Sequence, residues 1–301
     1  MNAVLFPGQG AQYPGMGKSF YEQCEKSRRV FGEIDSILGF ALTTSCFEGS
    51  ADELKNTALQ QLAIVSASIA AYEAWRTECS IDVGMAAGLS LGEYTGVYAA
   101  GVLELADVIR LVRERGDAMQ EAAEKNPAVM YAVMGIEPSR IEELAGEDRF
   151  YPANYNSPQQ TVVSLARAQR DPVRALLEKE GARVVELPVR GGFHSPLMKP
   201  AQLRLEKMIS SLSFRDARFP LVSNVSAKPH TRAEEIRENL ISQLVSPVRW
   251  RQSIECMHRE GADAFYEVGP SKILRGLMRK IIPGVQVRNI ENAADLPHKA
   301  A

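Results

Sequence analysis

The sequence predicts an α/β fold with two parts, a larger domain of alternating strands and helices and a smaller domain inserted within it. Two observations predict the larger part. The apolar segments "AVLF" and "MAAG" each run directly into a glycine-containing turn, and helical patterns with apolar residues three or four apart lie between them. The third observation is the order β-α-β-β-α-β between residues 127 and 190, which is that of a ferredoxin-like unit. We therefore expect a domain of residues 1–126 and 191–301, with a small domain at 127–190.

The part of the chain before the insert is expected to form two strands and four helical regions. The first strand breaks at Pro7-Gly8, and the second, "DVGMAAGLS", leads into the segment "GLSLG". Apolar periodicity predicts helical regions at 17–38, 50–78, 90–103 and 104–125. Ser50 and Glu53 have the spacing of a capping box. The last of these helices is expected to begin at Asp107.

The insert and the segment after it have equally clear patterns. Within the insert we expect strands at 128–136, 150–158, 160–166 and 182–189, with helices at 138–147 and 170–181. Asn126-Pro127 and Arg190-Gly191-Gly192 would be its two hinges. After it, helices are expected at 199–212, 233–245, 250–261 and 271–281, with strands at 219–227 and 264–270.

Composition excludes several classes of function. The chain has 301 residues and a formal net charge of −2, so it lacks the basic excess of a nucleic-acid-binding face. Neither a secretory signal nor an apolar run of ~18 residues is visible, so we expect no membrane partner. Four scattered cysteines without a CxxC pair predict reduced thiols, no metal site and a cytoplasmic protein: Cys24, Cys46, Cys79 and Cys256.

Ser90 is the candidate nucleophile. It lies in Gly88-Leu89-Ser90-Leu91-Gly92, which has the pattern Gly-x-Ser-x-Gly of a nucleophile elbow between a strand and a helix. Only small flanking residues fit such a turn, and the helix behind it places a positive dipole end near developing negative charge. A packing turn without a nucleophile explains the two glycines equally well. The apolar strand before the motif and the helix after it favour the elbow.

His194 is the best candidate for the base that a serine nucleophile needs. It lies in the loop "RGGFHSPLM" beside apolar residues, whereas His230, His258 and His298 lie in polar segments and are expected to be exposed. No acid stands out between Ser90 and His194. We therefore expect a dyad in which a main-chain carbonyl fixes the tautomer of the imidazole.

Two further segments admit a functional and a structural interpretation. The glycines of "FPGQGAQ" either make a simple turn or let a main-chain N–H there form an oxyanion hole with the N–H of Leu91. The segment "RERGDAMQ" contains Arg113 and Arg115. Either both arginines lie on a solvated helix face, or Arg115 points inward. A buried guanidinium needs an anion, and a substrate carboxylate suits its two-pronged geometry.

These segments together resemble one family, the malonyl-CoA:acyl-carrier-protein transacylases and the related acyltransferase domains of polyketide synthases. The matching segments follow the family's order through about residue 282: "FPGQGAQ", "GLSLGEY", "RGDAMQ", "NYNSPQQTVVS", "FHSPLM", "SNVSA", "SPVRW" and "YEVGPSKIL". The resemblance implies an α/β-hydrolase-like large domain with a ferredoxin-like insert. It also implies malonyl transfer from CoA to acyl carrier protein through a malonyl-serine, by a monomer that needs no metal or redox cofactor.

The resemblance assigns roles to individual residues. It implies Ser90 as nucleophile, His194 as base, and the N–H groups of Gln9 and Leu91 as the oxyanion hole. It further implies that Arg115 pairs with the malonyl carboxylate. Gln243, just before "SPVRW", would orient the histidine through its main chain.

The sequence also departs from the family pattern. Leu89 stands where the family usually has histidine before the serine, Leu62 stands for a proline, and Leu165 stands for a glycine. Phe193 matches members that select malonyl groups over branched ones, since a bulky ring beside the base leaves little room for an α-branch. A packing role explains the same ring.

Two other functions remain open on the sequence alone. A serine hydrolase acting on thioesters or acyl carrier protein could use the same scaffold, although a hydrolase for uncharged acyl chains gains nothing from Arg115. A catalytically silent binding protein for CoA or carrier protein would have no use for Ser90, His194 and Arg115 together.

Overall fold

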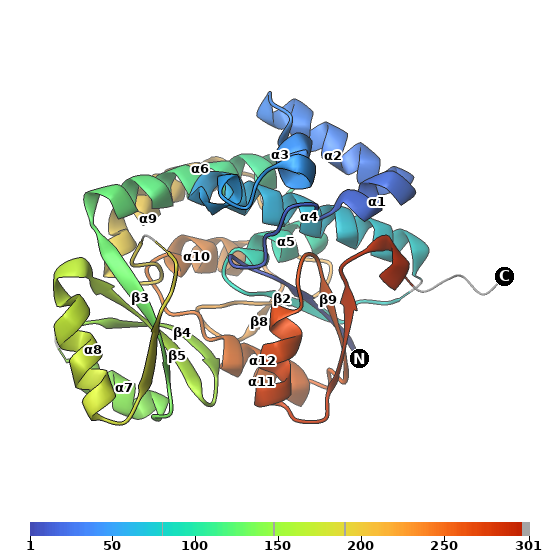
Figure 1. Cartoon of the computed structure of the whole chain (residues 1–301). Coiled ribbons are helices and arrows are strands. Elements are labelled where there is room, and N and C mark those ends of the chain that lie inside the picture. Colours follow the sequence, from blue (N-terminus) through green and yellow to red (C-terminus); the bar gives the residue numbers. More distant parts are fainter. Residues whose placement is uncertain (80, 147, 190, 297–301) are drawn as a thin grey trace.

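The computed structural model describes residues 1–79, 81–146, 148–189 and 191–296, and these residues form two β-sheets (Figure 1). Within them the larger sheet has six strands in the order β10-β9-β1-β2-β7-β8. Its neighbouring strands are parallel except for β7 and β8. The strands are β1 (Asn2–Phe6), β2 (Met85–Gly88), β7 (Leu221–Val222), β8 (Pro229–His230), β9 (Ala264–Val268) and β10 (Gln286–Ile290).

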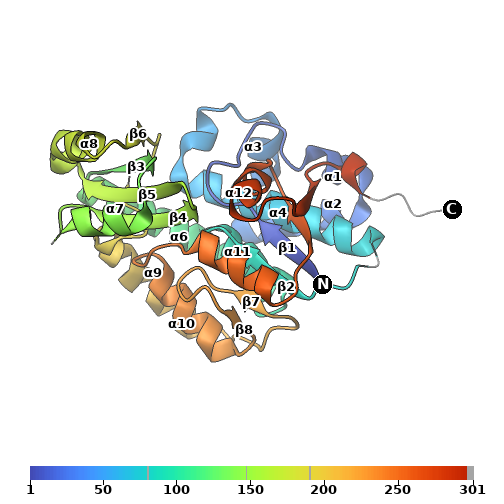
Figure 2. The same ribbon diagram turned by 90° about the horizontal axis from the view of Figure 1, so that it is seen from below.

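Helices cover both faces of this sheet. One face packs against α4, α5 and α6, and the other against α11 and α12, which cross in front of the sheet in Figure 2. The helices outside the insert are α1 (Lys18–Gln23), α2 (Glu25–Leu38), α3 (Leu42–Glu48), α4 (Thr57–Glu78), α5 (Gly92–Ala99), α6 (Leu105–Lys125), α9 (Lys199–Ser211), α10 (Ala233–Gln243), α11 (Trp250–Arg259) and α12 (Ile273–Ile281). Short 3-10 turns lie at Glu53–Lys55, Pro196–Met198 and Ala293–Asp295.

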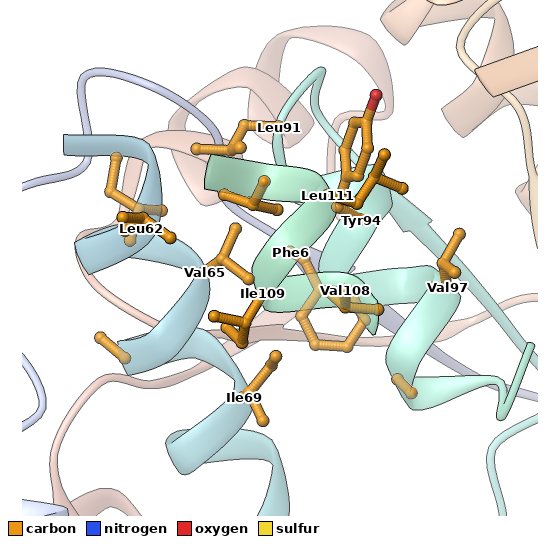
Figure 3. Packing of buried hydrophobic residues seen from close by; sticks show 14 of the residues in the cluster. Phe6, Leu62, Val65, Ile69, Leu91, Tyr94, Val97, Val108, Ile109 and Leu111 are labelled. Carbon is orange, nitrogen blue, oxygen red and sulfur yellow. The ribbon is translucent and has the colours of Figure 1, made fainter. Parts of the chain in front are cut away.

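Side-chain alternation along the strands separates the two cores. Val4 and Phe6 of β1 belong to the cluster shared with α4, α5 and α6, whereas Ala3 and Leu5 belong to the cluster shared with α11 and α12. This follows from the two-residue repeat of a strand, which directs successive side chains to opposite faces. Figure 3 shows Phe6 of β1 among apolar side chains of α4, α5 and α6. Buried on both faces, β1 reads as a continuous apolar run.

The smaller sheet contains the four strands of the insert, in the order β4-β5-β3-β6, with every neighbouring pair antiparallel. Two helices and a short 3-10 turn, Arg167–Gln169, connect them. The elements are β3 (Ala128–Met134), α7 (Pro138–Ala145), β4 (Tyr151–Ser157), β5 (Gln160–Ala166), α8 (Arg170–Lys179) and β6 (Arg183–Glu186). This is the ferredoxin-like arrangement, so the predicted fold class is confirmed.

The insert contacts the larger domain close to the loop after α10. The main chains of Ala153 and Tyr155 exchange hydrogen bonds with Val248, at 2.8 and 2.9 Å. The domain boundaries after Asn126 and before Gly191 stay predictions. Of the predicted features, Glu147, Arg190 and the tail with His298 lie outside the described residues.

Several predicted elements differ from the structure. The helix over 17–38 is two helices, because Cys24 takes extended backbone angles between them. The helix expected from Asp107 begins two residues earlier, at Leu105. The strand expected over 219–227 ends at Val222, because the chain turns back through Ala227, which has a φ of 54°, to pair β7 with β8. The helix α3 and the strand β10 were not predicted.

The capping box predicted at Ser50 and Glu53 forms. The Ser50 main-chain N–H donates to the Glu53 carboxylate at 2.7 Å, and the Glu53 N–H donates to the Ser50 hydroxyl at 3.2 Å. It closes the 3-10 turn ahead of α4 rather than α4 itself, whose N-cap is Asn56. In the described part of the chain, no helix combines the length and apolarity needed to cross a bilayer.

The parallel neighbours β1 and β2 end side by side, and the loops after them meet. A Cβ added to Gly92 would lie 2.1 Å from the carbonyl oxygen of Phe6. One added to Gly88 would lie 1.9 Å from the carbonyl carbon of Gly92, and one on Gly8 would lie 2.2 Å from the carbonyl oxygen of Leu89. These three glycines therefore allow the first loop, the strand end and α5 to touch backbone to backbone.

We predict that Gly92→Ala lowers the stability of the protein by about 1–3 kcal/mol, the usual cost of overpacking a closed site. The matched control is Gly32→Ala, an exposed position inside α2 where an added Cβ meets nothing within 4 Å. That control should instead stabilise by about 0.5–1 kcal/mol, because alanine favours a helix interior over glycine. Urea denaturation measures both, and a Gly92→Ala protein as stable as the parent would contradict the backbone contact.

Candidate active site

Ser90 lies on the turn between β2 and α5 with a left-handed backbone. Its φ is 52°, which a residue other than glycine rarely adopts and which costs about 1–3 kcal/mol. A hydrogen bond stabilises the turn, since the Ser90 main-chain N–H donates to the Asn224 side-chain oxygen at 2.6 Å. Ser90 is buried, with 6% of its surface exposed. This is the geometry of a nucleophile elbow.

His194 faces Ser90 from the loop before α9. Its Nε2 lies 2.7 Å from the Ser90 Oγ, although 104 residues separate the two in the chain. His194 is also left-handed, with a φ of 56°. The loop is fixed on both sides of the ring, because the Ser164 hydroxyl donates to the Phe193 carbonyl at 2.6 Å and the Ser195 hydroxyl donates to the Gly192 carbonyl at 2.5 Å.

The other ring nitrogen determines the tautomer of His194. Nδ1 lies 3.0 Å from the main-chain carbonyl oxygen of Gln243. A carbonyl oxygen only accepts, so in the neutral ring Nδ1 carries the hydrogen and donates it. Nε2 is then left with a lone pair toward the Ser90 hydroxyl, which is the arrangement that a general base requires.

Arg115 enters the same site from α6 and is fully buried. Its Nη2 donates to the Ser90 Oγ at 3.1 Å, and its Nη1 donates to the Gln61 side-chain oxygen at 2.5 Å. The guanidinium carbon lies 5.2 Å from the centre of the Tyr94 ring. Among the described residues, no carboxylate lies within salt-bridge distance of it. A buried cation without a fixed counter-ion is a receptor for an anion from outside the chain.

Burial and Arg115 together keep His194 neutral. Burial is the larger cause that lowers the pKa of the His194 imidazole to about 4, and the nearby positive charge of Arg115 lowers it further. The hydrogen bond to the Gln243 carbonyl acts in the opposite direction. A base of this kind is ready to accept a proton at neutral pH.

Gln9 and Leu91 are the residues whose main-chain N–H groups are predicted to form an oxyanion hole. Gln9 follows β1, whose loop touches Leu89 through Gly8, and Leu91 directly follows Ser90. Within the described residues, neither N–H donates to another protein group. The Gln9 side chain turns away to donate to Gln60 at 2.8 Å. The two N–H groups are thus available to bind a ligand oxygen.

Phe193 and the departures from the family pattern also have defined places. The Phe193 ring folds over Gly191, where an added Cβ would lie 2.4 Å from a ring atom, and it is buried in the main core. Leu62 is buried inside α4, and Leu165 is buried inside β5. Leu89 packs on the cluster beneath α11 and α12.

His230, His258 and the four cysteines lie outside this site. His258 is exposed, as expected, and its Nδ1 donates to the Ala262 carbonyl oxygen at 2.9 Å. His230 is half-buried rather than exposed, because it lies between the Ser226 hydroxyl and the Glu235 carboxylate. The cysteines are free. The described residues contain no cluster of three or more potential metal ligands.

Two residues of the site were missed by sequence reasoning. Asn224, in the loop after β7, accepts from Ser90 N and donates through Nδ2 to the Gly88 carbonyl at 2.7 Å. Glu93, in the first turn of α5, accepts from the Gln243 side chain at 2.6 Å. A signal for Glu93 was present, since it is the only charged residue between positions 83 and 103.

Comparison with known proteins gives the site a context. The family model described as "Acyl transferase domain" matches residues 4–298. The chain is 40% identical over 285 residues to the malonyl CoA-acyl carrier protein transacylase of Bacillus subtilis (strain 168), covering 93% of this chain and 90% of that protein. The enzyme of the same name from Escherichia coli (strain K12) is 37% identical, with 93% and 92% covered.

Solved structures agree with these relatives. The malonyl CoA-acyl carrier protein transacylase from Clostridium perfringens superposes with a TM-score of 0.93 at 33% identity, covering 98% of this chain and 94% of the other. A malonyl-transacylase in complex with a type II polyketide acyl-carrier protein superposes with a TM-score of 0.93 at 32% identity, covering 98% and 97%.

We predict that Ser90 reacts with a small sulfonyl fluoride at a rate that is constant at neutral pH and falls to half near pH 4, where the His194 imidazole takes up a proton. In Arg115→Met the midpoint should move upward, since one of the two causes of the low pKa is removed. Return of each acid-treated sample to neutral pH controls for unfolding. If the rate instead fell to half near pH 6.5, the ordinary pKa of histidine, His194 would not be a buried base that is kept neutral.

Proposed function

Because the chain belongs to the acyl transferase domain family, we propose that it is a malonyl-CoA:acyl-carrier-protein transacylase that moves a malonyl group through a serine ester. The observation that carries the proposal is the buried Arg115, which donates to the nucleophile itself and lacks an ion-pair partner among the described residues. A malonyl thioester has a free carboxylate a short, fixed distance from its reacting carbonyl. The negative charge of the malonyl carboxylate and its distance from the reacting carbonyl therefore match the charge and the place of Arg115 beside Ser90.

The first half-reaction acylates the enzyme. His194 Nε2 takes the proton of the Ser90 hydroxyl as its oxygen attacks the thioester carbonyl of malonyl-CoA. The carbonyl oxygen becomes an oxyanion, which we assign to the N–H groups of Gln9 and Leu91. The carbon–sulfur bond then breaks, and the proton on His194 passes to the departing CoA thiol.

The second half-reaction repeats these steps with a different thiol. The phosphopantetheine thiol of acyl carrier protein gives its proton to His194 and attacks the malonyl-serine ester. When the ester breaks, the proton returns to Ser90 and the malonyl thioester of the carrier protein leaves. The kinetics are ping-pong. Each step exchanges one acyl acceptor for another without a change in oxidation state, so we propose no metal or redox cofactor, and CoA is part of a substrate.

Arg115 changes partners during the cycle. In the free enzyme its Nη2 is bound to the Ser90 Oγ and its Nη1 to Gln61. Once Oγ is an ester oxygen, it accepts a hydrogen bond less well, and the malonyl carboxylate offers two charged acceptors instead. We assign to Gln61 the task of keeping the guanidinium aimed at the nucleophile, since its buried side-chain oxygen accepts from Nη1.

The comparisons favour a transferase over the hydrolase alternative, because the curated relatives bear transacylase names. The buried setting of Ser90 and His194 supports the same choice, since an ester that must wait for a thiol has to be protected from water.

We propose that Phe193 narrows the acyl pocket against α-branched groups. That the protein is a monomer and that it is cytoplasmic stay predictions.

We predict that the protein, given radiolabelled malonyl-CoA and acyl carrier protein, passes the label to the carrier protein. Without carrier protein, the label should stay on the peptide that contains Ser90. Ser90→Ala should abolish both signals, because it removes the hydroxyl oxygen that lies 2.7 Å from the base. Label released as free malonate at the rate of its uptake would identify a hydrolase, and label on another residue would refute the assigned nucleophile.

We predict that Arg115→Ala slows malonyl transfer about tenfold to hundredfold and largely spares acetyl transfer, which is the scale of a charge-assisted hydrogen bond of about 1.5–3 kcal/mol. The matched control is Arg113→Ala, an exposed arginine two residues earlier on the same helix. It should leave both rates unchanged. Equal losses for the two acyl groups in Arg115→Ala would exclude the carboxylate role.

A further inference from the structure

Glu93 is a buried carboxyl group that the reaction steps above do not use. It is 1% exposed, lies in the first turn of α5 and has no ion-pair partner within the described part of the chain. An unpaired buried carboxyl is unfavourable, so its presence three residues after the nucleophile needs a reason. The reason lies in its hydrogen bonds.

One oxygen of Glu93 joins two segments that approach the elbow from elsewhere in the fold. Its Oε2 accepts from the side chain of Gln243, at the end of α10, at 2.6 Å, and from the main-chain N–H of Asn224, after β7, at 3.3 Å. Both partners are fully buried. The oxygen thus ties α5, α10 and the loop after β7 to one point.

The two partners of Glu93 hold both main-chain polar groups of the nucleophile. The side chain of Gln243 donates to the Ser90 carbonyl oxygen at 3.0 Å, and that of Asn224 accepts from the Ser90 N–H at 2.6 Å. Ser90 has a strained, left-handed backbone that such bonds must maintain.

Gln243 also reaches the base by a second route. Its main-chain carbonyl accepts from Nδ1 of His194 at 3.0 Å. A shift of Gln243 therefore moves the acceptor that orients the imidazole and the donor that holds the serine backbone at the same time. Glu93 is the group that fixes the Gln243 side chain.

Resting on the proposed acyl transfer, we propose that Glu93 is a positioning residue: through one accepting oxygen it fixes Gln243 and Asn224, and through them it aligns the Ser90 hydroxyl with the His194 ring. The Gln243 carbonyl, rather than a carboxylate, holds the place beside Nδ1 that the acid of a catalytic triad would have. Glu93 therefore acts on the base through Gln243 and not by contact.

The acceptor oxygen, rather than the negative charge, does this work. Burial raises the pKa of the Glu93 carboxyl to about 7, and the bonds from Gln243 and Asn224 and the positive charge of Arg115 oppose that rise. Near neutral pH the group is therefore present in both protonation states, and in either state an oxygen remains that can accept the two N–H bonds.

The test compares single-turnover acylation of Ser90 by labelled malonyl-CoA in four variants, with each rate normalised to the fraction of protein that can be acylated. Glu93→Leu should acylate about tenfold to hundredfold more slowly, the scale of a misaligned reacting group, with the KM for malonyl-CoA unchanged. Glu93→Gln supplies the same acceptor oxygen and should stay within about fivefold of the parent.

Gln243→Leu keeps the main-chain carbonyl but removes the side-chain donor, and it should lose as much as Glu93→Leu. Because the two side chains share one hydrogen bond, the loss in the double variant should be smaller than the product of the two single losses. The control is Glu73→Gln, which alters a buried carboxylate paired with Arg76 away from the site. It should lower the melting temperature and leave the normalised rate unchanged.

A normalised rate of Glu93→Leu equal to that of the parent would overturn the proposal, and so would additive losses in the double variant or a Glu93→Gln as slow as Glu93→Leu. If Glu93→Leu does not fold, Gln243→Leu and Glu93→Gln still decide the outcome. Failure of the parent to take up malonyl would refute the proposed function instead. The reaction of Ser90 with a sulfonyl fluoride, which needs no malonyl group, would then test Glu93 by itself.

Discussion

The hydrogen bond between the Ser90 hydroxyl and Nε2 of His194 is the contact on which the rest of this site depends. It is 2.7 Å long, it is buried, and it joins two left-handed residues that are 104 positions apart. Left-handed backbone is unfavourable for both side chains, so the surrounding structure has to maintain it. Glycines at 88 and 92 allow the close approach at Ser90, and the hydroxyls of Ser164 on β5 and of Ser195 donate to the loop that carries His194.

Burial sets the chemical properties of the site, because none of its three ionisable groups forms an ion pair with another described residue. His194 is kept neutral, Glu93 is partly protonated near neutral pH, and Arg115 is a cation with only neutral groups in hydrogen-bond contact. A site that stores an unmatched positive charge beside a nucleophile favours a substrate with a negative charge. The buried cation lowers the stability of the folded protein without substrate, since it has no anion beside it until the substrate binds.

The sequence predicts most of the architecture, because most strands are apolar segments that end near glycine or proline, whereas the more polar strand β10 was not predicted. The six elements of the insert are each recognisable by periodicity, and the elbow by the two glycines around Ser90. Cys24, which divides the first predicted helix, has no local signal of that kind. Asn224 and Glu93 were missed for another reason: their partners come from distant segments, so their roles exist only in three dimensions. The carbonyl of Gln243 was expected from family resemblance, whereas its side-chain bonds were not.

The central claim is that the nucleophile, the base and a carboxylate receptor are assembled in one dry site before the substrate arrives. A crystal structure of the protein exposed to malonyl-CoA without carrier protein tests it most directly. We expect an ester on the Ser90 oxygen, with the free carboxylate on two nitrogens of Arg115 and the carbonyl oxygen between the N–H groups of Gln9 and Leu91. An ester whose carboxylate points to solvent, with Arg115 still bound as in the free enzyme, would contradict it.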